Sequence, residues 1–363
     1  MFFSTLQFLY FFAWAYIAWR INAGLKIKKP YNIYLFAGLL FIALISTLAF
    51  AGRNWQGPLM AVITPLGYIL MGVCGITITF FVLNDLLNLI FFKRKKFRYW
   101  STLIILCISI LACIWALLNA ALILRIKEVT IKVPDLPVES LRIVELSDLH
   151  ITKYTSPEII KKIFAKAESL NPDLIVITGD VIDTDINEGE AFRSYGFEQL
   201  KAPYGVFAVT GNHERRRLGA YFEMFYKLGI KVLQNESVLV DDKIILAGIN
   251  DNDWKNAGAI KAMFDALPGN GFVLLLSHRP ETFDIASAVA AKRGINIVQL
   301  SAHTHAGQIP PAEIVRKYFM KYNYGLYKIG NSVMYVTSGT RWWGPPMRFG
   351  NHSEIAVITL KRQ

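Results

Sequence analysis

The chain has 363 residues, of which 53% are hydrophobic; this composition is too apolar for an ordinary soluble protein and excludes intrinsic disorder. Its net charge of +12 is unevenly distributed. Residues 1–127 contain 12 Lys or Arg and one acid, whereas residues 128–363 contain 27 Lys or Arg and 26 acids and carry only +1. Because the polar half lacks a strong positive field, the sequence argues against nucleic acid as a partner. The three cysteines lie in apolar runs, which leaves the polar half without a disulfide.

The N-terminal half contains four long apolar runs. A helix that crosses a bilayer needs about 20 apolar residues, and the runs that meet or approach this length are 2–19, 33–51, 59–92 and 101–124. We therefore predict that residues 1–127 form an N-terminal bundle of four transmembrane helices. The third run is interpreted as one tilted helix kinked near Pro65 rather than two short spans. A cleaved signal peptide over 2–19 is disfavoured because the run lacks a basic leader.

The positions of the basic residues predict the orientation of this bundle. Lys and Arg are concentrated after the first run and after the third, whereas the loop between the second and third runs has only Arg53. Since cytoplasmic loops carry the excess of positive charge, the first and third connections should be cytoplasmic. We expect a multi-pass protein of the cytoplasmic (inner) membrane, in which both termini and the whole polar domain are extracytoplasmic.

One acid lies inside the third run, where an ionisable group is costly unless it is paired or hydrated. Asp85 could contact a lipid head group or a cation, or it could join helices through Asn84, Asn88 or Asn119. We favour the second interpretation, because polar side chains commonly bond across helices in membranes.

From residue 128 onward, short β-branched runs alternate with helical stretches, a pattern typical of a layered α/β domain. The predicted strands are 141–146, 173–178, 204–210, 243–249, 272–276, 295–300, 332–337 and 354–360. The predicted helices are 156–170, 218–228, 257–267 and 282–292. This pattern predicts a second domain over residues 128–363.

Compact polar motifs follow successive predicted strands, at the place where α/β folds carry their sites. They are Asp148-Leu149-His150, Gly179-Asp180, Gly211-Asn212-His213-Glu214, Ser277-His278 and His303-Thr304-His305. Carboxylates, imidazoles and an amide without a thiolate suit two divalent ions such as Mn, Fe or Zn. Asp180 is the best candidate for a bridging carboxylate, because the preceding glycine allows a tight turn beside the ions.

In this order of motifs, residues 129–363 resemble the calcineurin-like metallophosphoesterases, and most of all their bacterial membrane-tethered branch. The resemblance implies a four-layer αββα sandwich and attack of metal-bound hydroxide on phosphorus. It also implies that one metal is bound by Asp148, His150 and His305, the other by Asn212, His278 and His303, with Asp180 between them. His213 would donate a proton to the leaving group or a hydrogen bond in the transition state.

The chain departs from the family at two positions, Ala302 and Ala306, where the family usually has glycine. If either backbone needs a positive φ, alanine resists it, so the geometry of that loop is in question. Asp183 could orient a metal-site residue or serve only its own loop.

Two features bear on the substrate. Arg215, Arg216 and Arg217 directly follow the third motif and could bind phosphate, although a solvated loop is an equal alternative. The stretches 316–324 and 342–346 mix aromatic with basic or proline residues, as is common at the surface of a bilayer, but they could also be ordinary rim aromatics. We therefore expect an enzyme that hydrolyses a phosphate ester or pyrophosphate bond of a membrane lipid or lipid-linked substrate. The alternatives are a phosphodiesterase or phosphatase for soluble envelope metabolites, and a non-catalytic membrane binding or transport protein with an inactive hydrolase domain.

Overall fold

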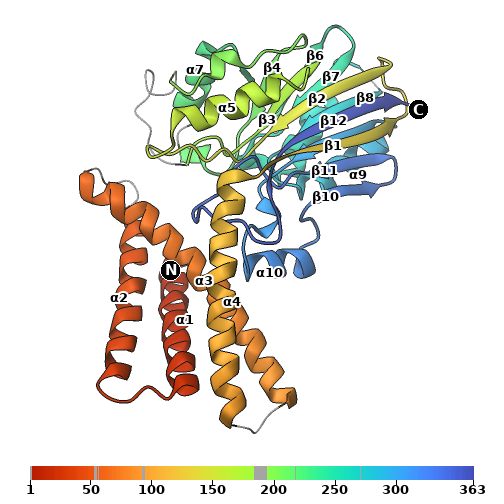
Figure 1. The fold of residues 1–363 in the computed structure, drawn as a ribbon. Helices are drawn as coiled ribbons and strands as arrows, with labels where there is room; N and C mark the ends of the chain where they lie inside the picture. Colours follow the sequence, from red (N-terminus) through yellow and green to blue (C-terminus); the bar gives the residue numbers. More distant parts are fainter. Residues whose placement is uncertain are drawn as a thin grey trace. The chain divides into compact units, whose positions relative to one another are not determined.

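The structure is a computed structural model that describes residues 2–52, 55, 57–91, 95–183, 194–216, 218–269 and 271–363. It contains two compact units (Figure 1). The helical unit consists of Met1–Ile123, Gly307–Val315 and Gly344–Asn351. The α/β unit consists of Leu124–Ala306, Arg316–Trp343 and His352–Gln363.

The helical unit is built from four long helices: α1 (Phe2–Leu25), α2 (Tyr31–Ala51), α3 (Pro58–Phe91) and α4 (Lys95–Leu122). The long third run forms the single helix α3 with Pro65 inside it, which confirms the prediction of one helix. Among the described residues, three stretches are long and apolar enough to cross a membrane: Tyr31–Ala51, Pro58–Leu89 and Phe97–Leu122. A fourth span through α1 stays a prediction.

The acid inside α3 connects this helix to α1. The Tyr16 hydroxyl donates to Asp85 Oδ2 over 2.5 Å, and the Arg20 guanidinium forms an ion pair with the same carboxylate. The expected helix-to-helix role is therefore correct, but the expected asparagine partners are wrong. Arg20 supplies the opposite charge that a carboxylate in an apolar helix bundle requires, which a neutral amide could not do.

The α/β unit contains two six-stranded mixed sheets. The first has the order β1-β12-β2-β3-β4-β5, with β1 (Leu124–Val133), β12 (Ser353–Arg362), β2 (Ser140–Leu146), β3 (Leu174–Thr178), β4 (Val206–Val209) and β5 (Lys231–Val232). The second has the order β10-β11-β9-β8-β7-β6, with β10 (Gly325–Ile329), β11 (Ser332–Val336), β9 (Asn296–Ser301), β8 (Phe272–Leu276), β7 (Ile244–Gly248) and β6 (Glu236–Val240). The central strands β2, β3 and β4 run parallel, as do β7, β8, β9 and β11.

Buried side chains from both sheets form one shared core cluster, which includes Leu174, Val176, Leu274 and Leu276. Helices α5 (Pro157–Glu168) and α7 (Leu218–Lys227) contribute to a second cluster with the first sheet. Helices α8 (Ala257–Asp265) and α9 (Thr282–Lys292) form a third with the second sheet. Strands β3 and β8 are buried at every position. Burial on both faces explains why their sequences are continuous apolar runs rather than alternating ones.

All eight predicted strands and all four predicted helices are present, so these sequence predictions are confirmed. Several elements were not predicted: the strands β1, β5, β6 and β10, the helix α10 (Ala312–Phe319) and the short 3₁₀ turns η1 (Phe197–Gln199), η2 (Glu214–Arg216), η3 (Asp251–Asp253) and η4 (His305–Gly307). The boundary between the two units lies between Ile123 and Leu124, and two later segments also belong to the helical unit. The division into domains at 1–127 and 128–363 stays a prediction.

We predict that Arg20→Met lowers the unfolding temperature of the full chain in detergent, because it leaves the Asp85 carboxylate without its ion-pair partner. The double variant Arg20→Met/Asp85→Asn should unfold at a higher temperature than the single variant, since removing both charges leaves no unpaired ion. Lys28→Met, at an exposed position after α1, is the control. Equal unfolding temperatures for the single and double variants would contradict this role of the ion pair.

Candidate metal centre

The polar motifs lie in loops that follow parallel strands of the two sheets. After β2 and β3, the backbone N–H of Asp148 donates to the Gly179 carbonyl over 3.1 Å, and that of His150 donates to the Asp180 carbonyl over 3.0 Å. In the second sheet, the Ala302 N–H donates to the His278 carbonyl over 3.0 Å. Parallel strands end at the same edge of a sheet, so their loops come together.

Five of the predicted metal ligands have a left-handed backbone although none of them is glycine. Their φ angles are 51° at Asp148, 42° at His150, 51° at Asp180, 70° at His303 and 51° at His305. This region is uncommon for residues with a side chain, and such strained residues are concentrated at functional sites. The loops therefore bend sharply so that these side chains reach one place.

The first cluster of candidate ligands contains Asp148, His150 and His305. His150 Nε2 lies 3.1 Å from His305 Nε2, and His305 Nε2 lies 3.5 Å from Asp148 Oδ1. Neighbouring nitrogen ligands of one cation at metal–nitrogen distances near 2.1 Å are separated by about 3 Å. This geometry suits a shared divalent ion.

The second cluster contains Asp180, His278 and His303. His278 Nε2 lies 3.2 Å from Asp180 Oδ2 and 3.2 Å from His303 Nδ1. His278 Nδ1 donates to the Thr178 carbonyl over 2.8 Å, since a carbonyl can only accept. That bond fixes the ring so that Nε2 faces the cluster, as the outer hydrogen bond of a metal-bound histidine does.

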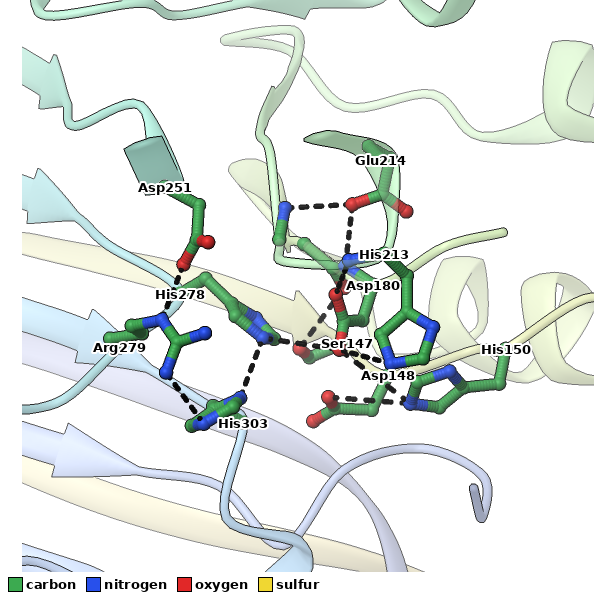
Figure 2. Close-up of polar contacts among 12 residues, drawn as sticks. Ser147, Asp148, His150, Asp180, His213, Glu214, Asp251, His278, Arg279 and His303 are labelled. Carbon is green, nitrogen blue, oxygen red and sulfur yellow. Dashed lines mark hydrogen bonds and ion pairs between the residues drawn. The ribbon is translucent and has the colours of Figure 1, made fainter. Parts of the chain in front are cut away.

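Asp180 lies between the two clusters (Figure 2). Its Oδ2 is 3.8 Å from His150 Nε2 as well as 3.2 Å from His278 Nε2. Burial raises the pKa of this carboxyl, but the surrounding imidazoles, above all His278, lower the pKa well below its ordinary value. Asp180 is thus an anionic side chain placed where a bridging ligand is needed, and the bridging role stays a prediction.

The remaining predicted ligand is an amide. Asn212 Oδ1 is buried, and no hydrogen-bond partner for it exists among the described residues. A buried carbonyl oxygen without a partner is costly, and coordination to a hard cation would satisfy it. This orphaned oxygen, the facing imidazole nitrogens and the two acids form a donor set that fits divalent ions.

His213 belongs to a third group of candidate ligands, with His150 and Asp180, which overlaps the two clusters. Its Nδ1 is 2.6 Å from Asp183 Oδ1, and its Nε2 is 3.8 Å from Asp180 Oδ2. Burial lowers the pKa of His213, but the negative charges of Asp180 and Asp183 outweigh this effect and raise the pKa to about 9. Asp183, for which the sequence left two roles open, orients His213.

Of the three arginines after this motif, only Arg215 has a side chain within the described residues. Arg215 Nε donates to Asp251 Oδ2 over 2.5 Å, and Arg215 Nη2 donates to the Asp251 carbonyl over 2.7 Å. The Arg216 side chain and the whole of Arg217 lie outside the described residues. Binding of substrate by Arg215, Arg216 and Arg217 stays a prediction, and Asp251 already engages the first of them.

The sequence motif included Glu214 but gave it no role; Glu214 is 3% exposed and acts as an acceptor for four backbone N–H groups. Its Oε1 accepts from Val181 over 2.7 Å and from Ile182 over 3.0 Å; its Oε2 accepts from Asp180 over 3.1 Å and from Gly211 over 2.7 Å. Glu214 thereby joins the loops that carry Asp180 and Asn212. The only signal in the sequence was its position directly after Gly-Asn-His.

A second missed group lies beside His303 (Figure 2). Asp251 is 2% exposed and its Oδ1 accepts from Arg279 Nε over 2.9 Å. Arg279 Nη1 lies 3.0 Å from His303 Nε2. Asp251 thus holds the guanidinium against a candidate ligand, and it does so from the turn η3, which no pattern in the sequence predicted.

The fold and these clusters define an α/β domain with candidate metal ligands at the ends of its strands. Residues 141–307 match the model of the family described as "Calcineurin-like phosphoesterase". The chain is 32% identical to "Transmembrane protein with metallophosphoesterase domain" of Danio rerio over 72% of this chain and 63% of that protein. It is 31% identical to the protein of that name from Bos taurus, over 74% of this chain and 64% of that relative, so it spans less than two thirds of both relatives.

A shorter relative is matched over most of its length. The chain is 32% identical to "Uncharacterized metallophosphoesterase YkuE" of Bacillus subtilis, over 64% of this chain and 84% of that protein. The chain belongs to the calcineurin-like metallophosphoesterase family, which confirms the resemblance drawn from the motifs.

We predict that Glu214→Ala lowers the free energy of unfolding by at least about 2 kcal/mol, because it leaves buried N–H groups without an acceptor. Glu214→Gln should be intermediate, since an amide keeps one of the two acceptor oxygens. Chemical denaturation of the full chain in detergent measures both effects. Glu223→Ala, at an exposed ion pair with Lys227, should change stability little. A Glu214→Ala protein as stable as this control would be inconsistent with the role assigned to Glu214.

Proposed function

We propose that the protein is a membrane-anchored, metal-dependent phosphoesterase that hydrolyses a phosphate ester or pyrophosphate bond. The observation that carries this proposal is the convergence of three overlapping groups of candidate ligands, in each of which the ligand atoms lie within 4.8 Å of one another. Asp148, His150 and His305 would hold one divalent ion (Mn, Fe or Zn), and Asn212, His278 and His303 the other. We also propose a four-layer αββα sandwich after four membrane spans.

Two divalent ions, when bound, would supply a Lewis acid for phosphoryl oxygen and water of lowered pKa near neutral pH. Asp180 would hold the ions together, and the residues around it would keep their ligand atoms in place. His213 would donate a proton to the leaving oxygen from Nε2, because Asp183 occupies its Nδ1. A positioned proton donor of this kind contributes about 10²-fold to 10⁴-fold in rate.

The substrate in this proposal is a phosphorylated lipid or a lipid-linked phosphate. Its support is a group of large exposed side chains that follow the candidate ligands in the chain: Tyr318 is 68% exposed, Phe319 79% and Met320 43%. Lys317 stacks on the Tyr318 ring, and mixed basic and aromatic surfaces favour the water–bilayer boundary. The near-neutral charge of residues 128–363 supports a substrate other than nucleic acid.

The proposal places the protein in the cytoplasmic (inner) membrane with its α/β unit outside the cytoplasm. The support is the clustering of Lys and Arg after the first and third apolar runs. Reporter fusions at the C-terminus that were active only in the cytoplasm would overturn this orientation.

We predict that Asp180→Asn and His213→Ala fail in different ways. Asp180→Asn should bind fewer than two Mn²⁺ per chain, because an amide lacks the second anionic oxygen. His213→Ala should keep its Mn²⁺ but lose about 100-fold in kcat toward a dialkyl phosphodiester, because an alkoxide leaving group needs the proton that His213 would donate. The loss toward bis(p-nitrophenyl) phosphate should be smaller, because p-nitrophenolate leaves without a proton. Metal analysis and steady-state kinetics on the full chain in detergent measure both.

Asp241→Asn, at a surface ion pair with Lys243, should resemble wild type in both assays. Wild-type turnover by Asp180→Asn or by His213→Ala would contradict the role proposed for that residue. A wild type that shows no turnover with Mn²⁺ bound would favour a non-catalytic membrane binding or transport protein instead.

We predict that Tyr318→Ser/Phe319→Ser lowers turnover of a phosphorylated lipid in vesicles several-fold while leaving bis(p-nitrophenyl) phosphate hydrolysis unchanged. The reason is that these side chains would contact the bilayer and not the reacting atoms. Tyr226→Ser, on α7 at a position 84% exposed, should alter neither activity. If the wild type cleaves soluble nucleotides well and every phosphorylated lipid negligibly, the substrate is a soluble envelope metabolite.

A further inference from the structure

Two segments of the C-terminal half of the chain belong to the helical unit: Gly307–Val315 and Gly344–Asn351. We call them the docked loops. The first begins two residues after His305, and the second begins one residue after Trp343. Each docked loop is therefore the direct continuation of a segment that borders the candidate metal centre.

The second docked loop is held by helices α3 and α4. Met347 is fully buried and forms a cluster with Ile76, Ala112, Cys113 and Ala116. Asn119 Nδ2 donates to the carbonyl oxygens of Arg348 and Asn351, each over 2.8 Å. The Arg348 N–H donates to the Ala116 carbonyl over 2.9 Å, and the Phe349 ring packs edge-on against Phe80. Because these contacts include directional hydrogen bonds as well as apolar packing, they fix the position of the loop on the two helices.

Two glycines of α3 make room for the docked loops. A Cβ at Gly72 would lie 2.4 Å from Met347 Sδ, and a Cβ at Gly75 would lie 2.8 Å from the backbone oxygen of Pro310. Both distances are shorter than carbon makes with neighbouring atoms in packed proteins. Since glycine is the least favourable residue of a helix interior after proline, the close approach of the loops explains the presence of glycine at these positions.

The residues just before each docked loop lie at the metal centre. His303 and His305 precede the first docked loop. Before the second docked loop, a Cβ at Gly339 would lie 2.9 Å from Asp148 Oδ2, and the Thr340 N–H donates to the Ser147 carbonyl over 2.8 Å. Within the same unit, the Trp343 ring packs edge-on against His213. A change in the docking of either loop would therefore reach candidate ligands within a few residues.

We propose that helices α3 and α4 position the metal centre through the docked loops, and that Gly72, Gly75 and Asn119 are positioning residues for phosphoester hydrolysis. This inference rests on the proposed function for its catalytic consequence but not for its effect on metal binding. None of the three residues bears a candidate ligand; their effect passes through the backbone of the docked loops.

The test compares Gly75→Ala and Asn119→Ala with wild type in the full chain in detergent. Both variants should raise the Kd for Mn²⁺ about tenfold, as loss of supporting contacts around metal ligands does. Both should also lower kcat/KM toward bis(p-nitrophenyl) phosphate by about 100-fold, as misplacement of reacting groups by about 1 Å can. Gly72→Ala should behave similarly, and the added variant Met347→Ala should restore Mn²⁺ affinity to Gly72→Ala, because it removes the atom that the new Cβ meets.

Two glycines of the same unit serve as controls. Gly38→Ala in α2 meets nothing within 4 Å, whereas a Cβ at Gly67 in α3 meets the Ala49 side chain at 2.2 Å and so disturbs the packing of helices alone. The inference is overturned if Gly67→Ala weakens Mn²⁺ binding as much as Gly75→Ala, or if Gly75→Ala and Asn119→Ala bind Mn²⁺ like Gly38→Ala. A wild-type protein that binds Mn²⁺ but hydrolyses no phosphoester refutes the proposed function and leaves the Mn²⁺ comparison to decide this inference.

Discussion

The candidate site depends on the close approach of two loops around one carboxylate. Asp180 can reach both clusters only because Gly211 presents no side chain to it: a Cβ there would lie 2.1 Å from Asp180 Oδ1. The His213 N–H donates to that same oxygen over 3.0 Å, and Glu214 receives the N–H groups of both loops. Gly211 therefore leaves space for Asp180, and Glu214 joins the two loops that surround it. These two residues of the third motif have structural roles apart from any reaction.

Buried negative charge around the clusters favours cations over an empty polar cavity. Asp148 and Asp180 are both buried. The neighbouring strand residue Glu145 is also buried, but burial and the nearby charge of Glu354 raise the pKa of its carboxyl and so favour its neutral form. Glu354 in turn accepts hydroxyl hydrogen bonds from Tyr335 over 2.7 Å and from Thr337 over 2.8 Å. Bound cations would compensate Asp148 and Asp180 together, whereas a purely structural network would need one partner for each of these acids.

The sequence was informative where a side chain's chemistry and its place after a strand coincide. Asp148, His150, Asp180 and His278 could be found in this way, because buried parallel strands read as continuous apolar runs and their ends carry the sites. Edge strands such as β10, whose side chains are half-buried or exposed, lack that signal. Interactions between distant segments, such as Arg20 with Asp85, gave no pattern at all. Predicting them requires the arrangement of helices, and residue spacing along the chain does not contain that information.

The sequence also could not show which of the two alanines at the family's usual glycine positions has a positive φ. Ala306 has φ 51° and ψ 27°, so the concern about a positive φ was justified at this position, whereas Ala302 is absent from the described residues with positive φ. A left-handed alanine costs about 1 kcal/mol relative to glycine, an amount that the contacts of a buried loop can offset. Ala306 is 6% exposed, and its N–H lies 3.2 Å from Thr304 Oγ1, which accepts from it. The loop therefore keeps the bend that brings His303 and His305 to the clusters, although it has alanine in place of glycine. Hydrogen bonding and burial offset the free-energy cost of the left-handed conformation at Ala306.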